Sequence, residues 1–157
     1  MNGPPVVSSR EVPAGFRPAN MPAGFIEANG PLFWKDQDGY LIFGIRIEPR
    51  HTNAAGNLHG GMMMTFVDMQ LNSALNYQLD TGLFIPTVSV TVDFLNPAFV
   101  GEWIQGRTEI LKRGGSTVFC ECRIAKEDGT LIGRASGIFK LPRNGDPNAL
   151  NPKDLFR

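Results

Sequence analysis

Apolar positions follow two different periods along the chain, and the change of period outlines the predicted elements. Residues 40–48 are rich in β-branched and aromatic side chains and stop at Pro49, which predicts a strand. In residues 59–79 apolar side chains recur every three or four positions, which predicts the longest helix of the chain. Four more strands are predicted at residues 86–95, 102–112, 117–126 and 130–141, because turn sequences separate these runs.

These elements predict an α+β fold. Their order is one strand, one long helix and then four strands in antiparallel succession, since short hairpin turns cannot make the crossovers that parallel strands need. A single apolar helix packs most economically when an antiparallel sheet curls round it. We therefore expect an antiparallel sheet wrapped around one long central helix.

Chain length and composition predict one domain with irregular ends. A chain of 157 residues is long enough for one full core and too short for two comfortable domains. Proline is frequent in the first 23 residues, where it denies both helix and central strand, although Phe16 and Met21 could pin part of this arm to the body. We predict an irregular arm at residues 1–35, with a turn at 29–31, then a domain at 36–142 that opens with a turn at 36–39, and an irregular tail at 143–157.

Charge and hydropathy argue against several classes of partner. Fifteen basic and fifteen acidic side chains balance, so nothing global indicates nucleic acid or an anionic membrane, and an anionic ligand would need a local cluster of Arg and Lys. No apolar run approaches the ~20 residues that span a bilayer. The N-terminus lacks the charged start and apolar centre of a signal peptide, so we expect a cytoplasmic protein.

The two cysteines predict no disulfide. Cys120 and Cys122 lie two residues apart in a predicted strand, so their side chains share one face and cannot easily bridge to each other. We expect reduced thiols in or near the core, which suits a reducing compartment. With only His51 and His59 besides, a zinc site lacks ligands, and we predict neither a metal nor a cofactor.

Candidate chemistry gathers at the start of the predicted helix. A glycine-punctuated loop begins at Asn53 and ends at Gly60 and Gly61, which open the helix. Free main-chain N–H groups at the positive end of a helix dipole can hold a carboxylate, a phosphate or the oxyanion of a reacting carbonyl. Asp68 stands two turns further on in an apolar run, and an oxyanion donor followed by a buried acid suits acyl transfer. The alternative is a tight helix start with one solvated acid.

A polar stripe marks one face of the same helix. Thr65, Asp68, Asn72 and Asn76 recur at spacings of three and four residues, while the remaining surface is broadly apolar. A helix this apolar is buried on most sides, so the stripe must face a cleft, a partner or a satisfied network. The stripe therefore indicates that Asp68 is not simply solvated.

A longer motif joins these residues and resembles a known family. The motif reads Asn53-x-x-Gly56-x-x-His59-Gly60-Gly61, then Asp68, then Asp93-Phe94-Leu95-Asn96-Pro97. It resembles the hotdog-fold acyl-CoA thioesterases of the phenylacetic-acid-degradation type, over about residues 40–141. The resemblance implies a hotdog fold, hydrolysis of an acyl-CoA thioester to free acid and CoA, and a homo-oligomer, dimer or tetramer, whose active site two subunits share.

The resemblance also implies roles for the residues that match the motif. The Gly60 N–H polarises the thioester carbonyl, with Gly61 as a second contact to the substrate. Asp68 is the catalytic carboxylate, which either activates water as a base or attacks the acyl carbon itself. Asn53 holds the water or the thioester in place.

Further polar side chains are implied near the acid. In such enzymes the strand after the helix supplies a hydroxyl, and counting back from Pro97 places Thr87 there. Asn72 on the helix is a second polar candidate. His59 braces the loop by hydrogen bonds rather than acting as a base, since the acid is supplied elsewhere.

Contacts with the coenzyme A arm and the acyl group are less sharply marked. Arg113 and the amides of the hairpin at Gly114 and Ser116 could meet phosphates, although such a hairpin is more often only a turn. Four large aromatic residues are expected in the core rather than in an acyl pocket: Phe94, Phe99, Trp103 and Phe139.

Spacing along the helix argues for a site made by two chains. Gly60 and Asp68 are eight residues apart, which separates them by ~12 Å of helical rise. A carboxylate that acts directly or through one water must come within about 3 Å of its target. Two antiparallel helices related by a two-fold axis would bring Asp68 of one subunit near Gly60 of the other, with the polar stripe lining the cleft between them.

Two other functions stay open. A hotdog dehydratase shares the fold but needs a histidine that acts with an acid on a hydroxyacyl substrate, and a third class binds acyl-CoA without catalysis. A thioester has a good leaving group, so one carboxylate and one oxyanion donor can suffice, and no G-x-S-x-G sequence argues for a serine triad. Release of free thiol from acyl-CoA separates hydrolysis from the other two functions. The acyl group and the choice between dimer and tetramer are left undetermined.

Overall fold

The computed structural model describes residues 11–20, 24–142, 154 and 156. Most of the predicted tail at 143–157 and the suggested contact of Met21 lie outside the described residues. Seven strands form one antiparallel sheet in the order β1-β2-β3-β5-β6-β7-β4. Their bounds are β1 Arg17–Pro18, β2 Phe33–Gln37, β3 Tyr40–Arg46, β4 Thr87–Phe94, β5 Trp103–Arg113, β6 Thr117–Lys126 and β7 Leu131–Lys140.

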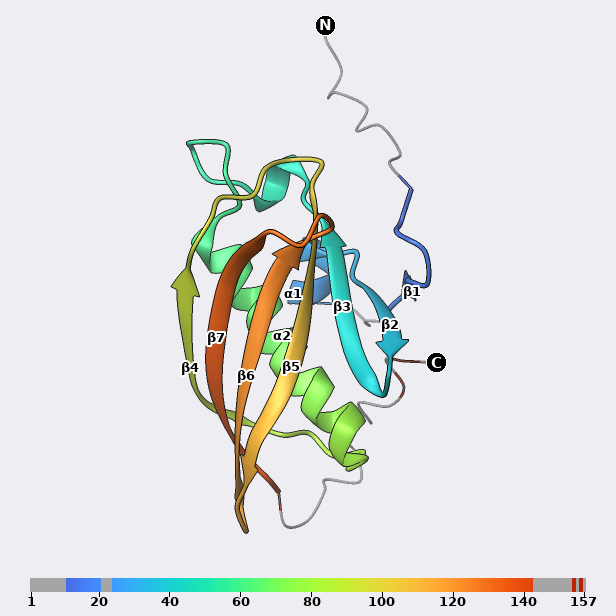
Figure 1. Cartoon of the computed structure of the whole chain (residues 1–157), viewed down its shortest axis with the longest axis vertical. Coiled ribbons are helices and arrows are strands. Elements are labelled where there is room, and N and C mark those ends of the chain that lie inside the picture. Colours follow the sequence, from blue (N-terminus) through green and yellow to red (C-terminus); the bar gives the residue numbers. More distant parts are fainter. Residues whose placement is uncertain (1–10, 21–23, 143–153, 155, 157) are drawn as a thin grey trace, which may run out of the picture.

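The sheet curls around one long helix, α2, which spans Gly60–Leu79 (Figure 1). A short helix α1 spans Phe25–Asn29, and a single 3-10 turn, η1, spans Pro49–His51 just before the loop that leads into α2. The predicted α+β fold, with an antiparallel sheet wrapped around a central helix, is confirmed. The predicted strand and helix bounds agree with the structure to within two residues, because each of these elements carries a full period of its hydrophobic pattern.

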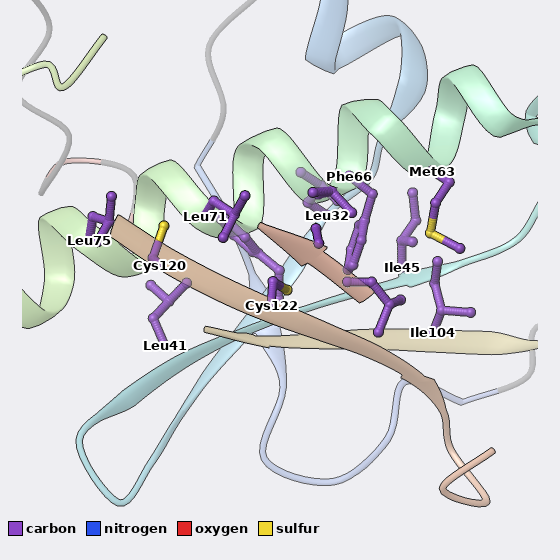
Figure 2. Close-up of a cluster of buried hydrophobic side chains, with 14 of the residues drawn as sticks. Leu32, Leu41, Ile45, Met63, Phe66, Leu71, Leu75, Ile104, Cys120 and Cys122 are labelled. Atoms are coloured by element: carbon purple, nitrogen blue, oxygen red, sulfur yellow. The ribbon is translucent and has the colours of Figure 1, made fainter. Parts of the chain in front are cut away.

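The core lies between α2 and the concave face of the sheet. Phe66, Leu71 and Leu75 point from α2 toward the strands, where Cys120 and Cys122 meet them (Figure 2). Each such side chain contributes about 1.5–3 kcal/mol by leaving water. Both cysteines are buried and unpaired, as predicted, and burial raises the pKa of each thiol to about 12.

One buried amide ties α2 to the sheet. The Gln70 side chain is fully buried; its Oε1 accepts from the Phe43 N–H at 2.8 Å, and its Nε2 donates to the Leu41 carbonyl at 3.0 Å and to Thr108 Oγ1 at 3.1 Å. A fully satisfied buried amide fixes the register of helix on sheet without an unpaired polar atom.

The described part of the N-terminal segment is folded, which differs from the irregular arm that we predicted. Strand β2 begins at Phe33, so the predicted boundary at residue 36 falls inside a strand, and the helix α1 precedes the predicted turn at 29–31. The Phe16 ring packs edge-on against Trp103 at 4.9 Å on the face of the sheet away from α2. Gly44 makes room for this contact, because a Cβ there would lie 2.1 Å from the Trp103 ring.

The two edges of the sheet are β1 and β4. Within the described chain, β4 pairs only with β7, so its other edge carries main-chain groups without a strand partner. Val88 and Phe94 on β4 are 63% and 57% exposed, which is high for apolar side chains on a strand. An open edge beside exposed apolar side chains is typical of a surface that another strand or subunit covers.

Candidate active site

The loop before α2 is held together by its own polar groups. Thr52 and Leu58 form an antiparallel bridge across its base, and the side chain of the next residue, Asn53, accepts two main-chain N–H groups. Asn53 Oδ1 accepts the N–H groups of Ala55 at 2.9 Å and Asn57 at 3.2 Å in an Asx turn, and Gly56, which has no Cβ, adopts the positive φ of 80° that the loop requires. The predicted role of Asn53 toward water or thioester therefore falls to its Nδ2 group, since its oxygen braces the loop.

At the start of α2 the Gly60 amide is open. His59 is the N-cap, and its Nδ1 accepts from the Gly61 N–H at 2.8 Å. His59 thus braces the turn, as we expected, and the Gly61 N–H is already occupied rather than free for a substrate. The Gly60 N–H has no hydrogen-bond partner among the described residues. Of the two candidate donors, Gly60 is the one at the positive end of the helix dipole that can receive an oxyanion.

The acid and the hydroxyl that the motif implies lie side by side. Thr87 opens β4, and its Oγ1 donates to Asp68 Oδ1 at 2.8 Å. Asp68 is half-buried, Thr87 is exposed, and Asp68 Oδ2 has no hydrogen bond to any described residue. One carboxylate oxygen is therefore fixed by a neutral donor while the other points to a surface that a reactant can reach.

The remainder of the polar stripe is satisfied inside the chain. Asn72 Nδ2 donates to the Ile85 carbonyl, Asn76 Nδ2 donates to Asn72 at 3.2 Å, and Thr81 Oγ1 donates to Asn76 Oδ1 at 2.9 Å. Asn76 is only 1% exposed, so the expectation that the whole stripe lines a cleft between subunits is wrong at this residue. Its partner Thr81 belongs to the segment between α2 and β4, which folds back onto the helix here. The Asn72 side-chain amide likewise binds this segment, through the Ile85 carbonyl.

A hollow of about 250 Å³ opens beside the start of α2. It is lined by Asn53, Asn57, Leu58, Met63, Phe94, Leu95, Asn96, Pro97 and Ala98. The Phe94 ring forms the wall next to the open amide, since a Cβ on Gly60 would lie 3.5 Å from it. The expectation that Phe94 and Phe99 belong to the core is wrong, because they are 57% and 46% exposed, whereas Trp103 and Phe139 are buried.

The hairpin at residues 113–116 lies at the far end of the sheet from Gly60. The end of β5 and the start of β6 sit beside the C-terminal part of α2, where Gln78 Nε2 donates to the Thr108 carbonyl at 3.1 Å (Figure 1). The Gly114 N–H donates to the Thr117 carbonyl at 2.7 Å, so it is not free for a phosphate. Within one chain the structure therefore does not bring Arg113, Gly114 or Ser116 to the helix start.

Sequence reasoning missed one residue at the base of the loop. His51 is 1% exposed, and both of its ring nitrogens contact main-chain groups. A histidine next to a proline carries no periodic signal, and its main partner lies 22 residues earlier in the chain. Burial lowers its pKa below the ordinary value of 6.5, and the nearby Arg50 adds to this effect.

The groups found on and beside α2 support acyl-transfer chemistry. An oxyanion donor, a carboxylate with one free oxygen and a partly apolar hollow lie on or beside the same helix. In the described parts of the chain, no three His, Cys, Asp or Glu side chains are grouped so that they could hold a metal ion. No helix in those parts is long and apolar enough to cross a membrane.

Comparison with known proteins gives a consistent result. The thioesterase superfamily matches residues 55–132. The chain is 32% identical over 132 residues to a protein of Pseudomonas aeruginosa named Putative esterase PA0474, which covers 83% of this chain and 98% of that protein. It is 37% identical over 97 residues to human acyl-coenzyme A thioesterase 13, which covers 60% of this chain and 67% of that protein.

A solved structure shares the architecture. The crystal structure of zebrafish thioesterase superfamily member 2 superimposes with a TM-score of 0.69 at 28% sequence identity. The alignment covers 76% of this chain and 87% of that chain.

Proposed function

The chain belongs to the thioesterase superfamily and is a thioester hydrolase, and we propose that its substrate is an acyl-CoA, which it hydrolyses to a free acid and CoA. The proposal is carried by the 2.8 Å hydrogen bond from Thr87 that holds one oxygen of the Asp68 carboxylate, on a helix whose first N–H, that of Gly60, has no partner among the described residues. The name of the human relative, an acyl-coenzyme A thioesterase, supports the choice of CoA as the thiol.

Each group has a distinct task in this proposal. The Gly60 N–H stabilises the negative charge that develops on the thioester oxygen, helped by the positive end of α2. Thr87 occupies Asp68 Oδ1, so Oδ2 is the oxygen that acts. It either removes a proton from the attacking water or attacks the acyl carbon to form an anhydride that water then cleaves. In both routes the C–S bond breaks and the thiolate of CoA leaves and gains a proton.

The distance along α2 supports a site that two subunits share. Eight residues separate Gly60 from Asp68, about 12 Å of helical rise, whereas both must reach one thioester carbon. We infer that two copies pair about a two-fold axis with their α2 helices antiparallel, so that Asp68 of one chain and Gly60 of the other act on the same thioester. The open edge of β4 and its exposed Val88 and Phe94 support a partner on that side.

The same pairing gives the distant hairpin a role. In an antiparallel pair of helices, the end of one subunit that carries Arg113 and Ser116 lies at the end of the other that carries Gly60. These two residues are then candidates for the phosphates of CoA, with the Arg113 guanidinium as the charged partner. The acyl group takes the hollow beside Phe94, whose volume of about 250 Å³ in one subunit is below the roughly 300–1,000 Å³ of pockets for drug-sized ligands.

The experiment is a panel of acyl-CoA substrates of increasing length and of aromatic character, read by the release of free thiol. We expect release that rises with enzyme concentration, for at least one class of acyl group. Absence of thiol release across the panel, with intact binding of acyl-CoA, would identify a binding protein instead. Conversion of a hydroxyacyl-CoA to an enoyl-CoA without thiol release would identify a dehydratase.

A further inference from the structure

His51 occupies an unusual position for a histidine outside the reacting groups. It is 1% exposed and lies in the turn η1, at the base of the loop that ends at Gly60. Its Nδ1 accepts from the Glu48 N–H at 3.0 Å, and its Nε2 lies 2.9 Å from the Asn29 carbonyl oxygen. A main-chain N–H can only donate and a carbonyl can only accept, so the ring is neutral with its hydrogen on Nε2.

Through this ring the base of the loop is fastened to α1. The last carbonyls of a helix have no partner within it, and the last two of α1, those of Ala28 and Asn29, are met by side chains of η1. Arg50 donates to the Ala28 carbonyl at 3.1 Å and to the Gly30 carbonyl, while His51 takes the Asn29 carbonyl between them. The adjacent side chains of Arg50 and His51 thus bind three successive carbonyls, and these hydrogen bonds hold η1 against the end of α1.

The same residue also holds the start of α2. The His51 carbonyl accepts the His59 N–H at 2.8 Å, and His59 Nδ1 in turn accepts the Gly61 N–H at 2.8 Å. Gly60 lies between these two anchored amides, so the direction of its own N–H is set by them. An oxyanion donor must stay within about 2.7–3.1 Å of the oxyanion, and a displacement of about 1 Å can cost 10²-fold in rate.

We propose that His51 is a positioning residue of the thioesterase site, whose neutral imidazole fixes the loop base to α1 and thereby aims the Gly60 N–H. The proposal rests on the role of Gly60 in the proposed function. It assigns to α1 the task of supporting the oxyanion donor through η1. His51 itself is fully buried and does not touch the reactants.

The test compares two buried polar residues that each make several hydrogen bonds. His51→Leu removes both ring contacts, and Gln70→Leu, as the matched control, removes the equally buried amide that ties α2 to the sheet. Both variants should lose stability in thermal melting. We expect kcat for thiol release to fall about 10-fold or more in His51→Leu with KM changed much less, and to stay within about twofold in folded Gln70→Leu. An equal loss of kcat in both variants, or wild-type kcat in His51→Leu, would overturn the proposal.

Two further measurements cover the remaining outcomes. His51→Asn keeps an acceptor for the Glu48 N–H, so it should fold even where His51→Leu does not, and recover part of kcat. Amide exchange of His59 and Gly61, followed by NMR, reads the loop without any substrate. We expect faster exchange at both amides in the His51 variants but not in Gln70→Leu, and this expectation does not depend on activity. If the wild-type protein released no thiol, that result would refute the proposed function alone. Unchanged exchange at both amides would refute the positioning role.

Discussion

At the C-terminal half of α2, Asn72 and Asn76 make hydrogen bonds with each other, with Thr81 just after the helix and with the Ile85 carbonyl, and Asn76 is buried. At the N-terminal half, the Gly60 N–H has no partner in the described chain and Asp68 keeps one free carboxylate oxygen. Both halves of this helix carry polar groups, side-chain amides in the first case and a carboxylate with a main-chain N–H in the second. The difference shows that a polar group on the helix does not by itself mark a site: the hydrogen bonds of one half stabilise the fold, and the groups of the other half stay available to a reactant.

The largest effect should come from the free carboxylate. Asp68→Asn keeps the shape of the side chain but offers neither a basic nor a nucleophilic oxygen, so thiol release should fall ~10²-fold or more while the melting temperature hardly changes. Asp93→Asn is the matched control, because Asp93 is an exposed acid that pairs with Arg134 at 2.8 Å. Near-wild-type turnover of a folded Asp68→Asn would remove Asp68 from the mechanism.

A smaller effect should follow from the hydroxyl that holds this carboxylate. Thr87→Val deletes the 2.8 Å hydrogen bond and keeps the side-chain volume, so Asp68 loses its fixed orientation. We expect kcat to fall about 10-fold. Thr91→Val changes another exposed threonine of β4 and should leave kcat unaltered. Equal kcat in the two variants would mean that Asp68 needs no positioning by Thr87.

The C-terminal half should respond in the opposite way. Asn76→Ala removes the partner of the Thr81 hydroxyl and the donor to the Asn72 side-chain oxygen, which should lower the free energy of unfolding by about 1–3 kcal/mol. The melting temperature should fall by roughly 2–4 °C for each kcal/mol. Turnover per folded molecule should be unchanged. A large loss of kcat at full folding would show that this half of the helix also takes part in the reaction.

The sequence alone could not predict most of this difference between the two halves of α2. The spacing of Asp68, Asn72 and Asn76 places them on one face of a helix, and that much is correct. The partners of each part of the face depend on the path of the chain between α2 and β4. This path brings the Ile85 carbonyl to Asn72, and Thr87 at the start of β4 to Asp68. Helical spacing reports a face and not its neighbours.

Long and short elements also differ in how well the sequence predicts them. β3, α2 and the four later strands each hold enough residues for the hydrophobic period to be visible, and their bounds agree with the prediction. β1 has two residues and α1 has five, so neither shows a period. Both have distant contacts: Phe16, next to β1, packs on Trp103, and the end of α1 binds Arg50 and His51. The high proline content was correctly read against a central strand, since Pro18 lies on the edge strand β1.

The smallest effect concerns His51 and pH. Its folded-state pKa lies below the ordinary 6.5, chiefly through burial and then through Arg50, with Glu48 and the Asn29 carbonyl acting in the opposite direction. Between the folded-state pKa and about pH 6.5, the His51 imidazole is protonated in the unfolded chain and neutral in the folded chain. Protonation therefore favours the unfolded chain, and the free energy of unfolding falls as the pH is lowered through this range. The melting temperature of His51→Asn should depend less steeply on pH there than that of the wild type. Parallel curves would contradict a neutral, buried His51.

The central claim, that Gly60 of one subunit and Asp68 of another act on the same thioester, has one direct test. Gly60→Pro removes the donor with little strain, because proline suits the first position of a helix and His59 already has the extended φ of −65° and ψ of 135° that a following proline favours. Gly60→Pro and Asp68→Asn should each be inactive alone. Co-refolded, their mixed dimers should recover thiol release, because one of the two sites then holds an intact Gly60 and an intact Asp68. If both variants fold and co-assemble but the mixture stays inactive, the two-subunit site is contradicted.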